Sequence, residues 1–197
     1  VFSLSDRRKI TEEGVRFQSH LDGSYHLFTP ESVVDTQRSI GSDIMMVLDE
    51  CPAADVSETY ARRSNDLTVR WAARCQDRLR TTAPLYGHHQ ALFAIVQGVT
   101  YPEIRRESAR RLVEMEFEGY AIGGLSVGEA APVMYEMVEV VAPLLPKAKP
   151  RYLMGVGTPE NLLENIARRV GGRDVSAADV ESLARWPNGA AASLAKG

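Results

Sequence analysis

Short apolar runs alternate with longer amphipathic segments through most of this sequence. Each run is too short for a helix and ends in residues typical of turns, so we predict strands that are buried on both faces. The expected strands are residues 44–48, 91–96, 119–122 and 151–154, and the expected helices are residues 30–40, 57–80, 102–116, 129–145 and 159–170. Strands that alternate with helices predict an α/β fold with a parallel sheet. Because no glycine-rich dinucleotide fingerprint follows the first strand, the pattern favours a partial (β/α)8 TIM barrel over a doubly wound sheet.

The first residues carry a different pattern. Alternating side chains flank Asp22-Gly23, a dipeptide that supplies the positive φ of a tight turn, so we predict an N-terminal β-hairpin that decorates the barrel. His20 and His26 flank this turn without a cysteine or carboxylate at ligand spacing, which favours a structural or exposed role. The next helix is expected to begin at Pro30 with Thr29 as its cap.

Composition limits the class of protein. The chain has 197 residues, 44% of them hydrophobic, which is enough for a globular core. It has no long apolar span, which argues against a membrane protein. Its two cysteines, Cys51 and Cys75, are too few for a metal cage or a disulfide framework, so we expect a reduced, cytoplasmic setting. A formal net charge of −3 excludes a surface that is positive throughout but is compatible with a local basic groove.

The expected strands end in residues that suit a binding site. Ligands of parallel sheets bind at the carboxyl ends of strands, and these ends carry Asp49, Gln97, Gly123-Gly124 and Met154. A carboxylate accepts two parallel N–H bonds, a carboxamide donates and accepts, and a glycine amide can approach a flat ligand closely. Methionine offers a polarizable surface for a ring. The set suits guanine, although helix capping, packing and sugar-phosphate binding remain open on chemistry alone.

Six sequence motifs, in this order along the chain, resemble the tRNA-guanine transglycosylase family. They are FSLSDRRKITEEGVRFQSHLDGS, IGSDIMMVLDEC, RWAARC, LFAIVQG, GYAIGGLSVGE and RYLMGVGTPENLL, and they extend over residues 1–170. The resemblance implies a (β/α)8 barrel with a zinc subdomain. It also implies an enzyme that exchanges guanine at the wobble position of tRNA for a 7-deazaguanine, a step toward queuosine.

The resemblance implies roles for individual residues. Asp49 resembles the aspartate that holds the guanine edge, and Gln97 resembles the amide beside it. Gly124, with its neighbour Gly123, resembles the backbone donor to the base carbonyl, and Met154 resembles the residue stacked on the ring. The segment that follows resembles the part that grips the tRNA, and a glycine-rich turn entering a helix suits phosphate. This RNA-binding segment consists of Gly155, Val156, Gly157, Thr158, Pro159, Glu160 and Asn161.

Cys51 and Val127 resemble the bacterial branch of the family. That branch implies 7-aminomethyl-7-deazaguanine as the incoming base. The implied partners are therefore this base and a tRNA with a GUN anticodon, without a membrane partner, and the complete protein is expected to form a homodimer.

The catalytic motifs that the resemblance implies are absent from the printed sequence. A DSGGFQ-like motif with the general acid/base aspartate belongs before Val1, and an FDCV-PTR-like strand with the nucleophile belongs after Val170. In the family mechanism the nucleophile attacks C1′ of the ribose while the second aspartate moves protons. Asp174 lies near the second place but lacks the surrounding residues. We therefore expect this chain to keep the walls of the guanine pocket without performing the exchange.

The zinc ligands implied by the resemblance are also missing. We expect no cofactor in this chain, although zinc is expected in the full-length family. The expected organisation is a partial TIM-barrel transglycosylase domain at residues 1–170. An atypical tail rich in alanine and glycine follows at residues 171–197, with a short helix at 177–185.

Two other functions remain open. A non-catalytic tRNA-binding subunit of the same family would have less reason to keep Asp49, Gln97 and Gly124. An unrelated TIM-barrel enzyme that acts on a small phosphorylated substrate would be expected to have a lysine at a strand end, and none of the expected strands ends in lysine.

Overall fold

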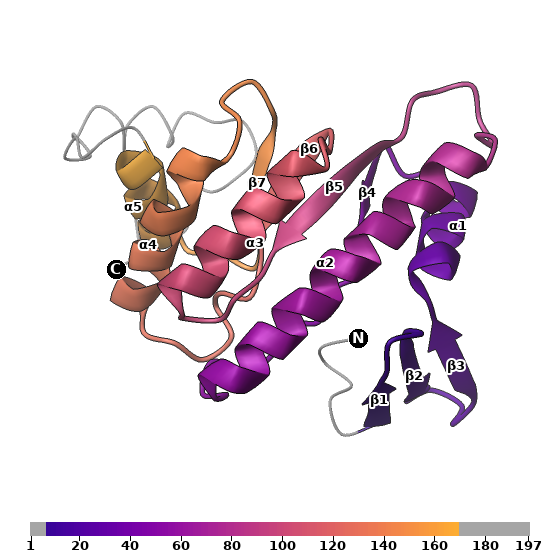
Figure 1. Cartoon of the computed structure of the whole chain (residues 1–197), viewed down its shortest axis with the longest axis horizontal. Coiled ribbons are helices and arrows are strands. Elements are labelled where there is room, and N and C mark those ends of the chain that lie inside the picture. Colours follow the sequence, from indigo (N-terminus) through magenta and orange to yellow (C-terminus); the bar gives the residue numbers. More distant parts are fainter. Residues whose placement is uncertain (1–6, 170–197) are drawn as a thin grey trace, which may run out of the picture.

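The computed structural model describes residues 7–169, which form two sheets of different kinds. Three short antiparallel strands, in the order β1-β2-β3, make an N-terminal sheet, and four strands, in the order β4-β5-β6-β7, make a central one. Helices α2 to α5 follow the central strands in turn, and each packs against the next (Figure 1). No helix in this part of the chain is long and apolar enough to span a lipid bilayer.

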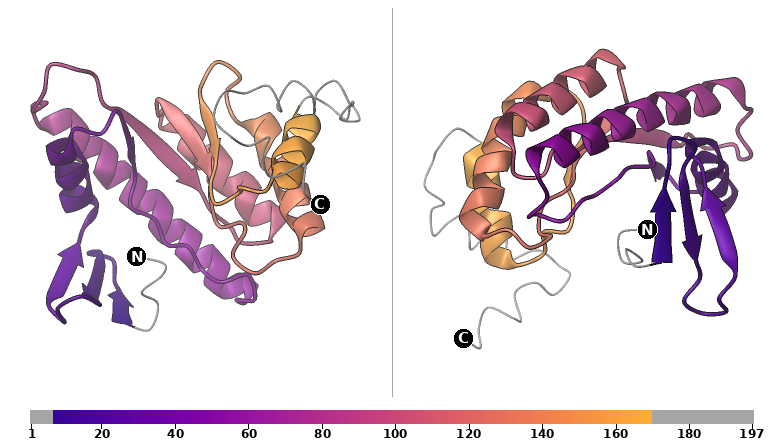
Figure 2. Two further views of the ribbon diagram at one scale, coloured as in Figure 1. Left: turned by 180° about the vertical axis from the view of Figure 1, so that it is seen from behind. Right: turned by 60° about the horizontal axis from the view of Figure 1, so that its bottom comes forward.

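The central sheet is parallel, as predicted. Its strands are β4 (Ile44–Met46), β5 (Ala91–Val96), β6 (Gly119–Ile122) and β7 (Arg151–Leu153). Met46 pairs with Phe93, and Ile122 pairs with both Val96 and Leu153. The strands lie side by side when viewed from the side opposite the helices (Figure 2, left). Because all four run in one direction, their carboxyl ends lie at one edge of the sheet.

The helices connect these strands close to the predicted positions. They are α2 (Glu58–Thr81), α3 (Pro102–Glu114), α4 (Ala131–Val141) and α5 (Pro159–Arg169). The helix predicted over 129–145 is α4 followed by a single 3-10 turn, η2 (Ala142–Leu144). Pro143 has no N–H to continue the α-helical ladder. Glu129 lies before α4, and its carboxylate accepts hydrogen bonds from the preceding loop. The strands predicted at 44–48 and 151–154 end slightly earlier, and the tail helix predicted at 177–185 lies outside the described residues.

The hydrophobic core lies between the central sheet and its helices. Leu67 and Trp71, one turn apart on α2, are buried in the same hydrophobic cluster as Ile95 of β5 and Tyr120 of β6. Met137 of α4 joins the same core. Burying a side chain of this size contributes about 1.5–3 kcal/mol relative to leaving it exposed.

The N-terminal sheet contains one more strand than the predicted hairpin. Its strands are β1 (Arg8–Ile10), β2 (Val15–Gln18) and β3 (Tyr25–Phe28). The hairpin is β2 and β3, which pair Phe17 with His26, and both His20 and His26 are exposed, as predicted. Strand β1 pairs Ile10 with the buried Val15. Three residues are too few to show a period of two, so the sequence pattern did not indicate β1.

The turn of the hairpin is wider than predicted. Strands β2 and β3 are joined by the loop of residues 19–24, in which Ser19 N donates to Ser24 O at 2.8 Å. Gly23 has the expected positive φ, +75°. Asp22, however, uses its side chain to accept a hydrogen bond from the Ser24 N–H at 3.1 Å. This local side-chain bond stabilises a longer loop in place of a two-residue turn.

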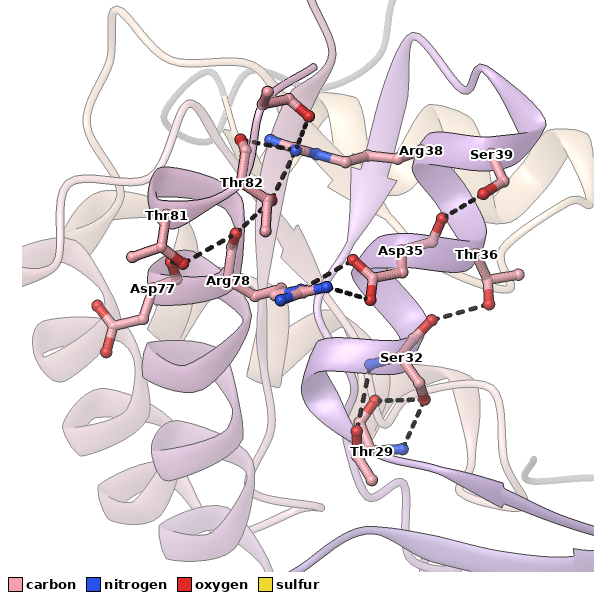
Figure 3. A network of polar contacts seen from close by, with 11 residues as sticks. Thr29, Ser32, Asp35, Thr36, Arg38, Ser39, Asp77, Arg78, Thr81 and Thr82 are labelled. Atoms are coloured by element: carbon pink, nitrogen blue, oxygen red, sulfur yellow. Dashed lines mark hydrogen bonds and ion pairs between the residues drawn. The ribbon is translucent and has the colours of Figure 1, made fainter. Parts of the chain in front are cut away.

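Helix α1 (Pro30–Ile40) begins as predicted, with Thr29 as its cap. Ser32 N donates to Thr29 Oγ1 at 3.2 Å, and Thr29 N donates to Ser32 Oγ at 2.9 Å (Figure 3). These reciprocal bonds satisfy two donors that the first turn of a helix leaves free.

Arg38 connects α1 to the end of α2. Its Nη2 donates to Leu79 O at 2.8 Å. Its Nη1 donates to Thr82 O at 2.8 Å (Figure 3). Arg78 also donates to both carboxylate oxygens of Asp35, at 2.9 and 2.7 Å, but this pair is partly exposed and contributes little. Arg38 is only 6% exposed, so the carbonyls that it satisfies depend on it.

We expect Arg38→Met to lower the free energy of unfolding by about 2–4 kcal/mol, because carbonyls at the end of α2 lose the charged donor that the buried Arg38 supplies. Urea unfolding followed by circular dichroism measures this loss. Arg80→Met is the matched control, since Arg80 is an exposed arginine near the end of α2. We expect it to change the stability by less than about 0.5 kcal/mol. Equal losses in the two variants would contradict the role of Arg38.

Candidate functional site

The residues that follow the parallel strands converge at one edge of the sheet. Gln97 Nε2 donates to Asp49 Oδ2 at 2.6 Å, which joins the end of β5 to the loop after β4. A Cβ atom on Gly123 would lie 3.0 Å from Gln97 Nε2 and 3.5 Å from Met154 Sδ, and one on Gly124 would lie 2.2 Å from Gln97 Oε1. The predicted strand-end residues Asp49, Gln97, Gly123, Gly124 and Met154 therefore lie together.

The loop that carries Asp49 is held by α2. Glu50 N donates to Thr68 Oγ1 at 3.0 Å, and Tyr60 Oη donates to Glu50 Oε1 at 2.5 Å. One residue before Asp49, Leu48 N donates to the buried Cys75 Sγ at 3.4 Å. These contacts fix the backbone on both sides of Asp49.

Asp49 lies in surroundings that disfavour its charge. The residue keeps some accessible surface, but protein surrounds its carboxylate, and this burial raises its pKa above the usual value of 3.8. The hydrogen bond from Gln97 acts in the opposite direction because it stabilises the carboxylate. A ligand with N–H donors would stabilise the charged form in the same way. Asp49 is therefore suited to a planar edge that presents two donors.

Gln97 is held between two strand ends. Its side chain is buried, with the residue 1% exposed, and its Oε1 has no hydrogen-bond partner within residues 7–169. The close approach of this oxygen to Gly124 leaves no room for a Cβ at that position. The carboxamide therefore has a fixed place beside Asp49 and offers a hydrogen-bonding group that the surrounding protein does not satisfy.

Cys51 lines the same region as an inert thiol. Burial, followed by the nearby Asp49 carboxylate, raises its pKa to about 11, and the backbone N–H of Gly124 acts in the opposite direction. A thiol with this pKa stays protonated near neutral pH and is a poor nucleophile.

Arg105 of α3 is buried behind the site, and the sequence analysis did not identify it. Its Nε donates to Val99 O at 2.5 Å, its Nη1 to Gly123 O at 3.0 Å and its Nη2 to Gly124 O at 2.9 Å. Burial lowers its pKa to about 10, so the guanidinium remains charged near neutral pH. The spacing of Arg105 with the buried Ala109 and Leu112 places it on the apolar face of α3, and that signal could have revealed it.

Arg8 of β1 also acts on the site. Its positive charge favours the carboxylate form of Asp49 and opposes the rise in the pKa of Cys51, as one of the smaller contributions to each. The N-terminal sheet was predicted as decoration of the barrel. Arg8 of its first strand adds a positive charge to the electrostatic surroundings of Asp49 and Cys51.

The loop after β6 is closed by Glu129, which the sequence analysis also missed. Its carboxylate accepts hydrogen bonds from the N–H groups of Ser126 and Val127, the latter at 3.0 Å. Ser126 has a positive φ of +56°, which is uncommon for a residue with a side chain. A Cβ on Gly155 would lie 3.7 Å from Ser126 Cβ, so the loops after β6 and β7 are in contact.

The predicted RNA-binding segment begins directly after Met154. Gly155, Gly157, Thr158 and Glu160 are exposed, whereas Val156, Pro159 and Asn161 are half-buried. Thr158 Oγ1 accepts a hydrogen bond from Asn161 N at 3.3 Å and caps α5. The Asn161 side chain accepts a bond from Tyr135 Oη at 2.5 Å, so it holds α5 against α4. The RNA-binding role of this segment stays a prediction.

The described residues provide no group of three or more His, Cys, Asp or Glu side chains that could hold a metal ion.

Comparison with known proteins identifies related sequences along most of the chain. A family model described as Queuine tRNA-ribosyltransferase matches residues 1–177. A queuine tRNA-ribosyltransferase of Caldanaerobacter subterraneus is 55% identical over 170 residues, and one of Ruminiclostridium cellulolyticum is 54% identical over 170 residues. Each match covers 86% of this chain and 44% of the relative. The chain thus spans less than half the length of these relatives.

We expect the Asp49→Asn variant to change how stability depends on pH. Because the folded-state pKa of Asp49 is raised, its favourable contribution is fully present below the usual value of 3.8 and is lost as the pH rises through the folded-state pKa. The variant cannot ionise, so it should be more stable than the parent at about pH 7, and the difference should disappear in acid.

Urea unfolding over a series of pH values measures this difference. Asp55→Asn is the matched control, because Asp55 is exposed in the segment between β4 and α2, and we expect it to follow the parent. The explanation fails if Asp49→Asn also follows the parent at every pH.

Proposed function

The chain belongs to the queuine tRNA-ribosyltransferase family, and we propose that it supplies the base-recognition part of a tRNA-guanine transglycosylase. Such an enzyme is a pentosyltransferase, and the proposed reaction replaces guanine at the wobble position of a tRNA with a GUN anticodon by 7-aminomethyl-7-deazaguanine. The observation that carries the proposal is the convergence of Asp49, Gln97 and Gly124 at one edge of the parallel sheet.

The hydrogen-bonding groups at this edge match guanine and 7-deazaguanines. The pyrimidine ring of these bases presents two adjacent N–H donors, at N1 and the 2-amino group, beside a carbonyl. In the proposed complex Asp49 accepts the two donors, and the Gly124 N–H and the Gln97 amide donate to the carbonyl. Met154 Sδ would lie 3.5 Å from a Cβ on Gly123, which supports its proposed place against the face of the ring.

We extend the proposal to the fold. Strands β4 and β7 are the outer strands of the described parallel sheet, and both carry exposed apolar side chains, with Ile44 52% and Tyr152 47% exposed. Such edges suit pairing with further strands, which supports a partial (β/α)8 barrel. The zinc subdomain and the homodimer of the complete protein belong to the same proposal and rest on the family resemblance.

In the proposed reaction, the steps after the base is bound are carried out by the two aspartates that the resemblance implies. One attacks C1′ of the ribose, so that the bond between C1′ and the base breaks, and the other moves the protons. Neither motif is part of the printed sequence, so we propose that this chain by itself binds the base without exchanging it. Expulsion of the base from its stack would precede binding, as in other enzymes that act on a base.

Two assays on the same protein test the proposal. Isothermal titration calorimetry measures binding of 7-aminomethyl-7-deazaguanine, and incorporation of labelled guanine into a tRNA with a GUN anticodon measures exchange. Binding without incorporation is the expected result. If the parent chain incorporates guanine and Asp49→Ala does not, the proposed base pocket stands but the proposal that this chain performs no exchange is wrong. If the parent chain does not bind the base, the proposed function is wrong.

We expect Asp49→Ala to weaken binding of 7-aminomethyl-7-deazaguanine by about 100-fold, because two donors of the base lose a charged acceptor. Calorimetric titration gives the dissociation constants. The control is Asp55→Ala, which removes an exposed carboxylate outside the site and should leave the affinity unchanged. A similar affinity in both variants would show that Asp49 does not bind the base.

The proposed RNA-binding segment leads to a second prediction. Thr158→Asp preserves a side chain that can cap α5 but adds a negative charge beside the proposed path of the tRNA backbone, so we expect tRNA binding to weaken about fivefold. Fluorescence anisotropy with labelled tRNA at several salt concentrations measures the affinity, which should fall steeply as salt increases. Thr81→Asp, at the exposed end of α2, is the control. Equal effects of both substitutions would show that residue 158 has no special contact with RNA.

A further inference from the structure

Arg105 combines complete burial with an unusual set of partners. The residue is 0% exposed, and its described hydrogen bonds run to three backbone carbonyls, those of Val99, Gly123 and Gly124. The neighbouring Arg106 and Arg111 of α3 instead form ion pairs with carboxylates that are at least partly exposed. Burying a charge is costly unless its surroundings compensate for it, so the position of this guanidinium requires an explanation beyond packing.

The first effect of Arg105 concerns the peptide group between Gly123 and Gly124. The Gly123 carbonyl, which accepts from Nη1 at 3.0 Å, and the Gly124 N–H belong to the same peptide group. A charged donor on the oxygen polarises the group and makes its N–H a stronger donor. The Gly124 amide is one of the groups that lower the pKa of Cys51, and a sulfur atom is only a weak acceptor. A ligand carbonyl would be a better partner.

The second effect concerns the loop that follows Gln97. Val99 has a φ of +54°, a conformation that is strained for a β-branched residue. Its carbonyl accepts from Arg105 Nε at 2.5 Å. A Cβ atom on Gly98 would lie 2.8 Å from Arg105 Cγ, so the turn lies directly against the arginine side chain. Arg105 therefore stabilises the strained turn that sets the position of Gln97.

We propose that Arg105 is a positioning residue that fixes Gln97 relative to Gly124 and strengthens the Gly124 N–H as a donor to the carbonyl of a bound base. Arg105 thereby increases the preference of the site for bases that carry a carbonyl over bases that lack one. The identity of the ligand rests on the proposed function. The polarised Gly124 amide, by contrast, is a property of the ligand-free protein.

Paired ligands separate this role from a merely structural one. The probes are 7-aminomethyl-7-deazaguanine and its analogue without the carbonyl oxygen, titrated calorimetrically into the parent chain and into Arg105→Met. We expect the substitution to weaken binding of the carbonyl ligand about tenfold and binding of the analogue less than about threefold. Arg110→Met, which removes an exposed arginine from the same helix, should change neither affinity. Equal losses for the two ligands, or no loss, would overturn the proposal.

The ligand-free protein provides an independent measurement. In 15N–1H correlation spectra, Arg105→Met should move the Gly124 amide proton upfield, since a weaker donor is less deshielded, and should leave the amide of Tyr60 unchanged. An unmoved Gly124 resonance would overturn the polarisation. This spectrum also keeps the two proposals distinguishable, because failure of the parent chain to bind either base would contradict the proposed function without affecting the amide measurement.

Arg105→Lys provides a second test in case Arg105→Met fails to fold. Lysine keeps the charge but cannot donate to three carbonyls at once. We therefore expect the amide shift of Gly124 and the preference for the carbonyl ligand to fall between those of the parent and those of Arg105→Met, with thermal unfolding as the check on folding. Loss of folding in both variants would overturn the proposal by showing that Arg105 serves the whole fold.

Discussion

Parallel pairing of β4 to β7 is the constraint on which the candidate site depends. It places the carboxyl ends of all four strands at one edge. Strand β5 is central to this arrangement, since it pairs with β4 and β6 and carries Gln97 directly after its last residue. The pairing with β6 requires Gly119, because a Cβ there would lie 2.3 Å from the ring of Phe93. The parallel pairing of the strands thus determines both the register of the sheet and the geometry of the site.

The polar groups at this edge are only partly compensated by the protein. Burial raises the pKa of Asp49 and lowers that of Arg105 to about 10, so both groups are less favourable in their charged forms than they are in water. They do not pair with each other, because Arg105 donates to carbonyls and Asp49 accepts from Gln97. Departures of this kind from a fully satisfied interior are expected at functional sites.

The sequence was sufficient to predict the parts that follow from periodicity. The apolar runs predicted four parallel strands, and their direction predicted that Asp49, Gln97 and Gly124 would meet. The six-residue loop after β2 was not predictable in the same way, because it depends on a side-chain bond made by Asp22. Arg105 was missed because its partners are carbonyls up to 19 residues away in sequence. A carbonyl carries no residue-specific signal, so its partner emerges only in three dimensions.

The hydrogen bond between Gln97 and Asp49 has a consequence for selectivity. In the ligand-free site, the Gln97 amide gives Asp49 a donor that partly offsets the burial of its carboxylate. A base that brings its own donors to Asp49 replaces this bond and frees the amide, which then needs an acceptor such as the carbonyl of the same base. A ligand with the donors but no carbonyl would leave the displaced amide without an acceptor, and a ligand with only the carbonyl would leave Asp49 with no donor except the Gln97 N–H. The proposed pocket therefore selects for both features at once, since each partial match leaves a buried polar group with fewer hydrogen-bond partners than the full match provides.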